Sequence, residues 1–365
     1  MKLFEISNYL DHRVPLSLQE DYDNCGLLIG DKNTEINSVL VCLDCTEKVL
    51  DEAIKNGNNL IISHHPVLFH GIKKITSDNY TERIVQKAIK CNIAIYAMHT
   101  NLDNQYGGVS FELANKIPLQ NTRVLKPKTH TLTKLTTYCP SSHTELVRNT
   151  LFSNGAGGIG QLYDRCSFVS SGEGSFRPLD GADPFYGKVG QASVVQEDKI
   201  EVVFPSYLQP LILSTLNQSH PYQEVSYTCV DINNKSQNGS GVIGEIVDSM
   251  SLNLFLAHVK KVTNSNVIRY NNSSVKKNIK NIAICGGSGR FLLEDAIKNN
   301  ADVLITSDFK YHDFFDCNDD IIVFDIGHYE SEYFTQDLIM RILKEKFSKL
   351  AIHLTTICTN PILYY

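Results

Sequence analysis

The sequence lacks several features that would assign the chain to a class. It has no apolar run of about 18 residues, so no membrane-spanning helix is expected. Its start, MKLFEISNYLDH, lacks the apolar segment of a secretory signal. The ten cysteines have no framework spacing, which predicts reduced thiols in a cytoplasmic protein.

The sequence also contains fewer basic than acidic residues. Lys and Arg number 34 against 40 Asp and Glu, and the formal net charge of −6 argues against nucleic-acid binding. The local cluster Lys276, Lys277 and Lys280 is interpreted as a solvated face. At 365 residues, with 42% hydrophobic and 20% charged residues, the chain is predicted to be globular. The length suits two domains, or one domain with an insert.

Strands and helices alternate along the first 125 residues. Short apolar strand patterns occur at 39–43, 59–63 and 93–97. Helical patterns lie between them, from residue 47 to about 57 and around 80–90. This alternation predicts an α/β fold, with a mostly parallel sheet covered by helices.

The pattern changes over residues 126–235. The expected order there is strand, helix, strand, strand, helix, strand, which is the ferredoxin-like arrangement. The polar stretch 233–241 predicts an exit linker. We therefore predict an inserted α+β domain at 126–235, and a discontinuous core made of 1–125 and 236–365.

The α/β pattern that follows the insert repeats the first part of the chain. Residues 50–56 match 293–299, and His99 matches His328, each after a buried strand. A repeat of this size predicts two similar α/β halves that form a pseudo-twofold core.

Histidines and carboxylates gather after the predicted strands. Ligands bind beyond the carboxyl ends of strands in open α/β sheets. Imidazole and carboxylate together are ligands for zinc, iron or manganese, and this many groups would suit a dinuclear site with a bridging carboxylate. The residues are His64, His65, His99, Asp103, His328 and Glu332.

A structural role is the alternative for each histidine. A single histidine at a strand end, such as His99, is usually a hydrogen-bonded structural residue. The adjacent pair His64 and His65 is harder to explain in this way, because burying two imidazoles requires two partners. The metal-site interpretation is therefore favoured for the group.

Five motifs of the two α/β halves carry a family resemblance. They are Asp23–Gly30, Ser63–Pro66, His99–Asp103, Ser307–Asp313 and Gly327–Glu332. Together they resemble the signatures of the GTP cyclohydrolase I type 2 homologue family, also called Nif-three-like. The resemblance covers both halves of the core and implies a dinuclear metal site and a homohexameric toroid. The insert, with the motif His220–Glu224, resembles the PII-like or CutA-like unit of longer members.

The resemblance also implies roles for the gathered residues. Glu332 matches the bridging carboxylate, and His99 matches a histidine close to the metals. Two divalent ions per chain are expected, with zinc preferred over iron or manganese. The residues that match the family's metal ligands are His64, His65, Asp103, His328 and Glu332.

The resulting hypothesis is a metal-dependent hydrolase of unknown substrate. His99 would act as general base or orient the attacking water. The family name suggests a purine nucleotide such as GTP, and a phosphoester is a further option. The alternative is a non-enzymatic metal-binding or regulatory assembly whose insert senses a small molecule or a partner. A ring that acts on nucleic acid is disfavoured by the acidic charge.

Overall fold

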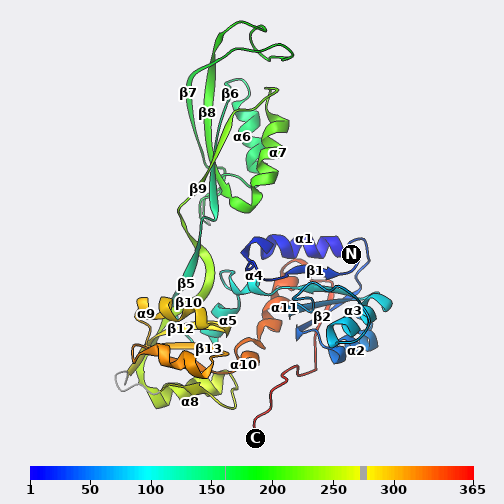
Figure 1. Cartoon of the computed structure of the whole chain (residues 1–365), viewed down its shortest axis with the longest axis vertical. Coiled ribbons are helices and arrows are strands. Elements are labelled where there is room, and N and C mark those ends of the chain that lie inside the picture. Colours follow the sequence, from blue (N-terminus) through cyan, green and yellow to red (C-terminus); the bar gives the residue numbers. More distant parts are fainter. Residues whose placement is uncertain (161, 272–277) are drawn as a thin grey trace. The chain divides into compact units, whose positions relative to one another are not determined.

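The chain is a mixed α/β protein with three sheets in two compact units (Figure 1). The computed structural model describes residues 1–160, 162–271 and 278–365. The core unit comprises Met1–Pro127 and Gln237–Tyr365, and the second unit comprises Lys128–Ser236. Lys276 and Lys277, from the predicted solvated face, lie outside the described residues.

The first sheet of the core unit has the order β1-β4-β3-β2-β15. Strands β4, β3, β2 and β15 run parallel to one another, and the edge strand β1 is antiparallel to β4. Helices α2 (Glu47–Asn56) and α3 (Tyr80–Lys90) cover one face. The strands are β1 (Gly26–Ile29), β2 (Ser38–Asp44), β3 (Leu60–His65), β4 (Ala94–Ala97) and β15 (Ala351–Leu354).

The second sheet has the order β11-β14-β13-β12-β10-β5. Strands β12, β13 and β14 run parallel, while β11 and β10 are antiparallel to their neighbours β14 and β12. Helix α9 (Leu293–Lys298) covers the outer face. The strands are β5 (Gln120–Thr129), β10 (Lys235–Ser251), β11 (Arg269–Tyr270), β12 (Asn278–Ser288), β13 (Val303–Ser307) and β14 (Ile322–Asp325).

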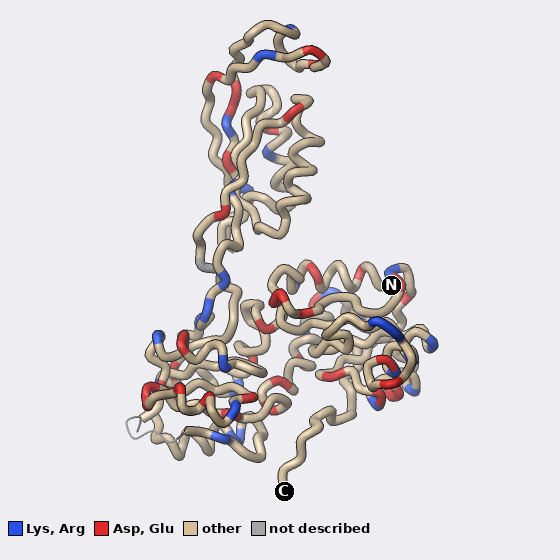
Figure 2. Tube along the Cα trace, in the orientation of Figure 1, with Lys and Arg blue, Asp and Glu red and all other residues tan. Residues whose placement is uncertain are grey.

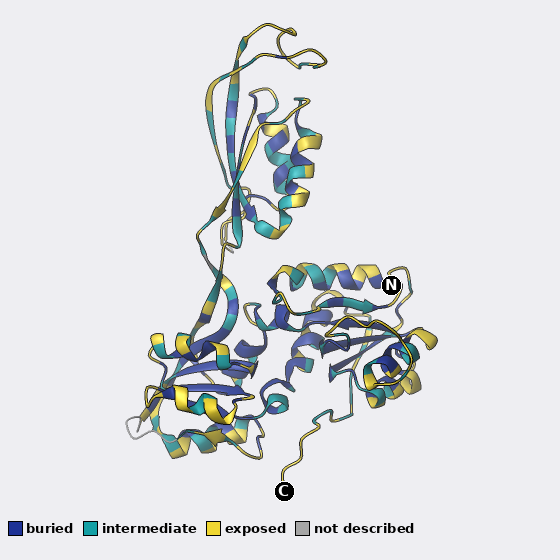
Figure 3. Ribbon diagram, in the orientation of Figure 1, coloured by how far each residue is buried: buried dark blue, intermediate teal, exposed yellow. Residues whose placement is uncertain are grey.

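One hydrophobic core joins the inner faces of the two sheets. Figure 3 shows the central strands of both sheets as buried, with exposed residues on the outer sides of the helices. Helix α5 packs on β12 and α11 packs on β2, so each half covers the other's sheet. The helices of the core are α1 (Leu3–Arg13), α4 (Thr100–Asp103), α5 (Val109–Lys116), α8 (Leu252–Val262), α10 (His328–Glu332) and α11 (Thr335–Lys346).

Among the residues that the structure describes, every helix is too short or too polar to cross a bilayer.

Short 3₁₀ turns connect longer elements in both units. The turns are Leu16–Leu18, Ser206–Leu208, Arg290–Leu292 and Tyr311–Cys317.

The second unit contains an antiparallel sheet with the order β7-β8-β6-β9. Its two helices pack together, and their apolar side chains form a separate core with one face of the sheet. The elements are β6 (Leu132–Pro140), α6 (Thr144–Ser153), β7 (Ser167–Phe176), β8 (Ser193–Pro205), α7 (Gln209–Ser219) and β9 (Tyr227–Ile232).

The predicted exit linker at 233–241 is wrong for most of its length, because residues from Lys235 onward belong to β10. The polar composition suggested a loop, but the core provides partners for these groups. The Gly239 N–H donates to the carbonyl oxygen of Asn104 at 2.7 Å. The Ser240 hydroxyl donates to Asn104 Oδ1 at 2.8 Å. A polar segment can therefore be a strand where its hydrogen bonds are satisfied.

Removal of the second unit should leave a folded core. We expect a chain in which a short Gly-Ser linker replaces residues 128–236 to unfold cooperatively, because β5 and β10 are neighbours in one sheet. The shared core of the two sheets also takes no residue from that segment. Circular dichroism melting and gel filtration, with the full chain as control, would test this. Loss of cooperative unfolding would show that the segment is integral to the core.

Candidate metal centre

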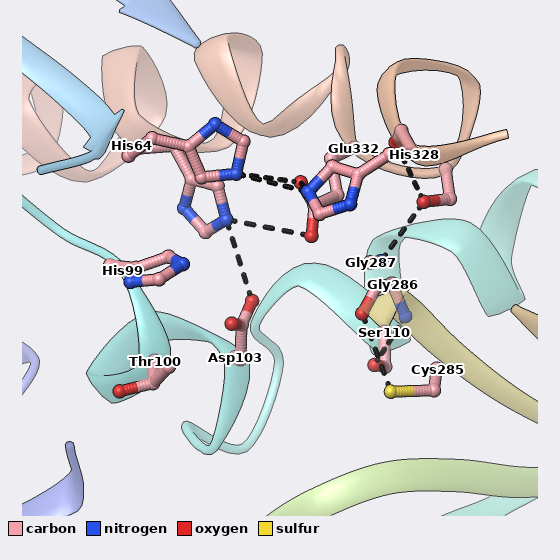
Figure 4. A network of polar contacts seen from close by, with 12 residues as sticks. His64, His99, Thr100, Asp103, Ser110, Cys285, Gly286, Gly287, His328 and Glu332 are labelled. Atoms are coloured by element: carbon pink, nitrogen blue, oxygen red, sulfur yellow. Dashed lines mark hydrogen bonds and ion pairs between the residues drawn. The ribbon is translucent and has the colours of Figure 1, made fainter. Parts of the chain in front are cut away.

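The structure brings all six predicted residues together at one end of the core strands. Strand β3 ends in the adjacent histidines, β4 is followed by the short helix α4, and β14 is followed by α10. Figure 4 shows the side chains of these segments turned toward one another. The residues are His64, His65, His99, Asp103, His328 and Glu332.

Their nitrogen and oxygen atoms form three overlapping groups that could each hold a metal ion. Within a group, all candidate ligand atoms lie within 4.8 Å of one another. His99 lies in one group, at the same range as the predicted ligands. The groups are His64, His65 and His99; His65, His328 and Glu332; and His64, Asp103 and Glu332.

Glu332 lies at the centre of the cluster. Its Oε2 is 3.0 Å from His65 Nε2 and 3.0 Å from His328 Nε2. Its Oε1 is 3.8 Å from His64 Nε2. The two oxygens of one carboxylate therefore face different histidines.

Two buried polar atoms of the site have no hydrogen-bond partner in the part of the chain that the structure describes. They are His64 Nε2 and Asp103 Oδ1, and they lie 3.6 Å apart. That distance is too long for a hydrogen bond, and a buried polar atom without a partner costs free energy. Two ligand atoms that each lie about 2 Å from one metal ion have a similar separation. The residues present therefore fit a metal ion.

Each histidine has one ring nitrogen fixed by a second residue. This contact sets the tautomer and directs Nε2 toward the centre, as is usual for metal-binding histidines. The Nδ1 contacts are His64 to the Met98 carbonyl oxygen (2.7 Å), His65 to Asp44 (2.7 Å), His99 to Asp23 (2.8 Å) and His328 to Asp308 (2.6 Å).

The contacts of these aspartates with the histidines were not predicted from the sequence. Asp23 and Asp308 lie within the quoted motifs, where they had no assigned function. Asp44 is the last residue of β2 and is paired in register with His65. Its position at a strand end, next to a strand that ends in histidines, was the available signal.

In the absence of a metal, the acidic groups strongly favour the protonated forms of His65 and His328. Burial alone would lower the pKa of His65, but Asp44 and Glu332 outweigh burial and raise this pKa to about 10. Burial likewise opposes the rise for His328, where Glu332 and Asp308 raise the pKa to about 11. Protons on these two histidines thus balance the carboxylates, and a bound metal ion would have to displace them.

The two central carboxylates behave differently. Burial and the charge of Glu332 raise the pKa of Asp103 above its usual range. Burial would also raise the pKa of Glu332, but His328 and the other histidines hold it well below the ordinary value. Glu332 is therefore the permanent negative charge of the site.

Gly287 provides the space for that carboxylate. It has a φ of +66°, and a Cβ atom added there would clash with Glu332 Oε1. We expect Gly287→Ala to lower metal content sharply, because the methyl group displaces Glu332. Elemental analysis of purified protein would measure this.

Gly57→Ala is the matched control. Gly57 has a similar φ of +71°, but nothing lies within 4 Å of an added Cβ. Both variants should lose about 1 kcal/mol of stability from the left-handed backbone. Equal metal content in the two variants would show that Gly287 does not position Glu332.

Comparisons with known proteins show which family the chain resembles along its length. The family model of Duf34/NIF3 (NGG1p interacting factor 3) matches residues 1–361. The GTP cyclohydrolase 1 type 2 homolog of Staphylococcus aureus (strain MSSA476) is 36% identical over 369 residues, which cover 100% of both chains. The namesake from Bacillus subtilis (strain 168) is 36% identical over 353 residues, 95% of this chain and 94% of the relative.

A solved structure extends the similarity to the fold. The Bacillus cereus protein related to NIF3 has a TM-score of 0.83 and 34% identity, and the match covers 100% of this chain and 99% of that one. The resemblance predicted from the five motifs is confirmed. This chain therefore belongs to the Duf34/NIF3 family.

Proposed function

We propose that the protein binds two divalent metal ions and acts as a metal-dependent hydrolase. The observation that carries the proposal is the position of Glu332, whose two oxygens face different histidines. His64 and Asp103 would hold one ion, and His65 and His328 the other. Glu332 would bridge them. Zinc is the preferred candidate for this ligand set, with iron and manganese as alternatives.

His99 is the proposed base of the reaction. Bound divalent ions would polarise a substrate oxygen and lower the pKa of water. The Asp23 carboxylate holds His99 Nδ1, so Nε2 can accept a proton near the centre. Burial would raise the pKa of Asp23, but His99 holds it far below the usual range. Asp23 therefore stays ionised and stabilises the protonated ring.

The pocket beside the centre favours a small substrate. It has a volume of about 220 Å³ and is lined by acidic residues such as Glu20, and by the rings of Tyr22 and Phe291. Within the described part of the chain, its lining includes no Lys or Arg. A triphosphate would find no lysine or arginine side chain there to bind its phosphates. We therefore propose a small ester, amide or single phosphoryl group in preference to the GTP suggested by the relatives' names.

The architecture also supports two structural proposals. The orders β1-β4-β3-β2 and β11-β14-β13-β12 match, each with an antiparallel edge strand, which supports a pseudo-twofold core. The order β7-β8-β6-β9 supports a ferredoxin-like, PII-like second unit. A homohexameric toroid remains a proposal from the family resemblance, and sedimentation analysis would test it.

Other functions have less support. Figure 2 shows Lys and Arg interspersed with Asp and Glu in each unit, which does not favour nucleic-acid binding. All ten cysteines are free thiols, which supports a proposed cytoplasmic location. A regulatory role is the second candidate, because the second unit contains a large cavity of its own.

Glu332→Gln should lose most of both metal ions, because it removes the carboxylate common to the two proposed ligand sets, His64 with Asp103 and His65 with His328. Elemental analysis after metal loading would measure the loss against about two ions in the parent. Glu330→Gln is the control, since Glu330 is also a buried carboxylate on α10, but it accepts from Asn360. Loss of a single ion would make Glu332 a terminal ligand.

His99→Ala should keep both metal ions while hydrolysis falls about 10²–10⁴-fold. The assay would use a panel of small esters and phosphoesters, together with GTP. The exposed His12→Ala is the control for removal of an imidazole. Loss of one ion would make His99 a ligand. A fully loaded parent that turns over no substrate of the panel would favour the regulatory alternative.

A further inference from the structure

The second unit contains a cavity that the metal centre does not use. Its volume is about 920 Å³, within the range of small-molecule sites, and all of its lining residues belong to this unit. The segment that joins β7 to β8 forms one wall, and the turn after α7 forms another. The site is therefore complete within one unit of one chain.

Aromatic rings converge on this cavity. The ring centroids of Phe185 and Tyr222 are 6.2 Å apart, and those of Phe176 and Tyr222 are 6.3 Å apart. Phe185 and Tyr186 are 45% and 39% exposed, although their rings pack at 4.7 Å. Large rings left open on a concave surface are suited to stacking with a flat ligand.

A carboxylate without a cation lies among these rings. Glu197 is half-buried and accepts a hydrogen bond from the Tyr222 hydroxyl at 2.6 Å. Over the described residues, no Lys, Arg or His forms an ion pair with it. Glu201 on the same strand differs, because it is paired with Lys134 at 3.0 Å and Lys199 at 3.1 Å. Lys199, a cation of the cavity wall, is thus already neutralised.

The charge of the whole lining is negative. The lining contains four carboxylates and two cations, and one of these cations, Lys199, is paired with Glu201. A ligand with negative charge would be repelled by this surface. The charged lining residues are Glu173, Arg177, Asp180, Glu197, Lys199 and Glu224.

We propose that this cavity is a binding site for a small organic cation with a flat aromatic ring. The face of a tyrosine or phenylalanine ring attracts a cation, and here several rings are available. Glu197 would provide the opposite charge at hydrogen-bond or contact distance. The site does not depend on the proposed hydrolase function, and it would give the second unit a ligand-sensing role.

Two probes of the same shape test the proposal on the full-length protein. N-methylquinolinium carries one positive charge, whereas methylnaphthalene is its uncharged counterpart. The protein contains no Trp, so the fluorescence of either probe can be titrated directly. We expect the cation to bind at least about tenfold more tightly than the neutral probe. Equal affinities, or no binding of the cation at millimolar concentration, would overturn the proposal.

Glu197→Gln should abolish the preference for the cation and leave methylnaphthalene binding unchanged. Glu145→Gln is the control, because this carboxylate lies on α6 outside the cavity lining. Phe185→Ala provides a second variant at an exposed ring and should weaken both probes. A preference for the cation that survives Glu197→Gln, or binding that is unaffected by Phe185→Ala, would place the probe elsewhere.

Discussion

Glu332 carries a negative charge at a position where only 2% of its surface is exposed. A buried carboxylate is tolerated only when cations or hydrogen-bond donors surround it. His64, His65 and His328 provide that environment, and their second nitrogens are held in turn. Protons on His65 and His328 balance the charge of Glu332, and bound metal ions would take the place of these protons. The surrounding structure holds these three histidines close to Glu332.

The cluster around Glu332 can form because the two sheets of the core unit share one hydrophobic core. Parallel strands bring their carboxyl ends to one edge, so the ends of β3 and β4 place their histidines side by side. Helix α10 contributes Glu332 from the second sheet, and α10 packs on β12 at its glycine-rich end. Helix α5 of the first half packs on β12, and α11 of the second half packs on β2, which holds the two halves together. The site therefore depends on long-range packing that neither half could provide alone.

The sequence predicted the elements better than the contacts between them. Apolar strand patterns followed by polar residues located His64, His65 and His99, because strand ends are visible in local sequence. The role of Asp44 depends on the register between β2 and β3, which local sequence does not specify. The start of β10 at Lys235 was not predicted. The polar residues Gly239 and Ser240 are hydrogen-bonded to Asn104, which is far away in the sequence. Side-chain partners across the fold are decided by tertiary packing.

In the proposed pseudo-twofold repeat, two equivalent histidines have different surroundings. His99 and His328 hold matching places in the two halves, and each contacts an aspartate through Nδ1. The Asp23 side chain is 0% exposed, whereas that of Asp308 is 48% exposed. His328 also contacts Glu332 at 3.0 Å, whereas the described residues show no ion pair between His99 and Glu332. A ring held by one buried aspartate can exchange a proton without disturbing the central carboxylate. The matching position would thus suit the proposed metal ligand in one half and the proposed base in the other.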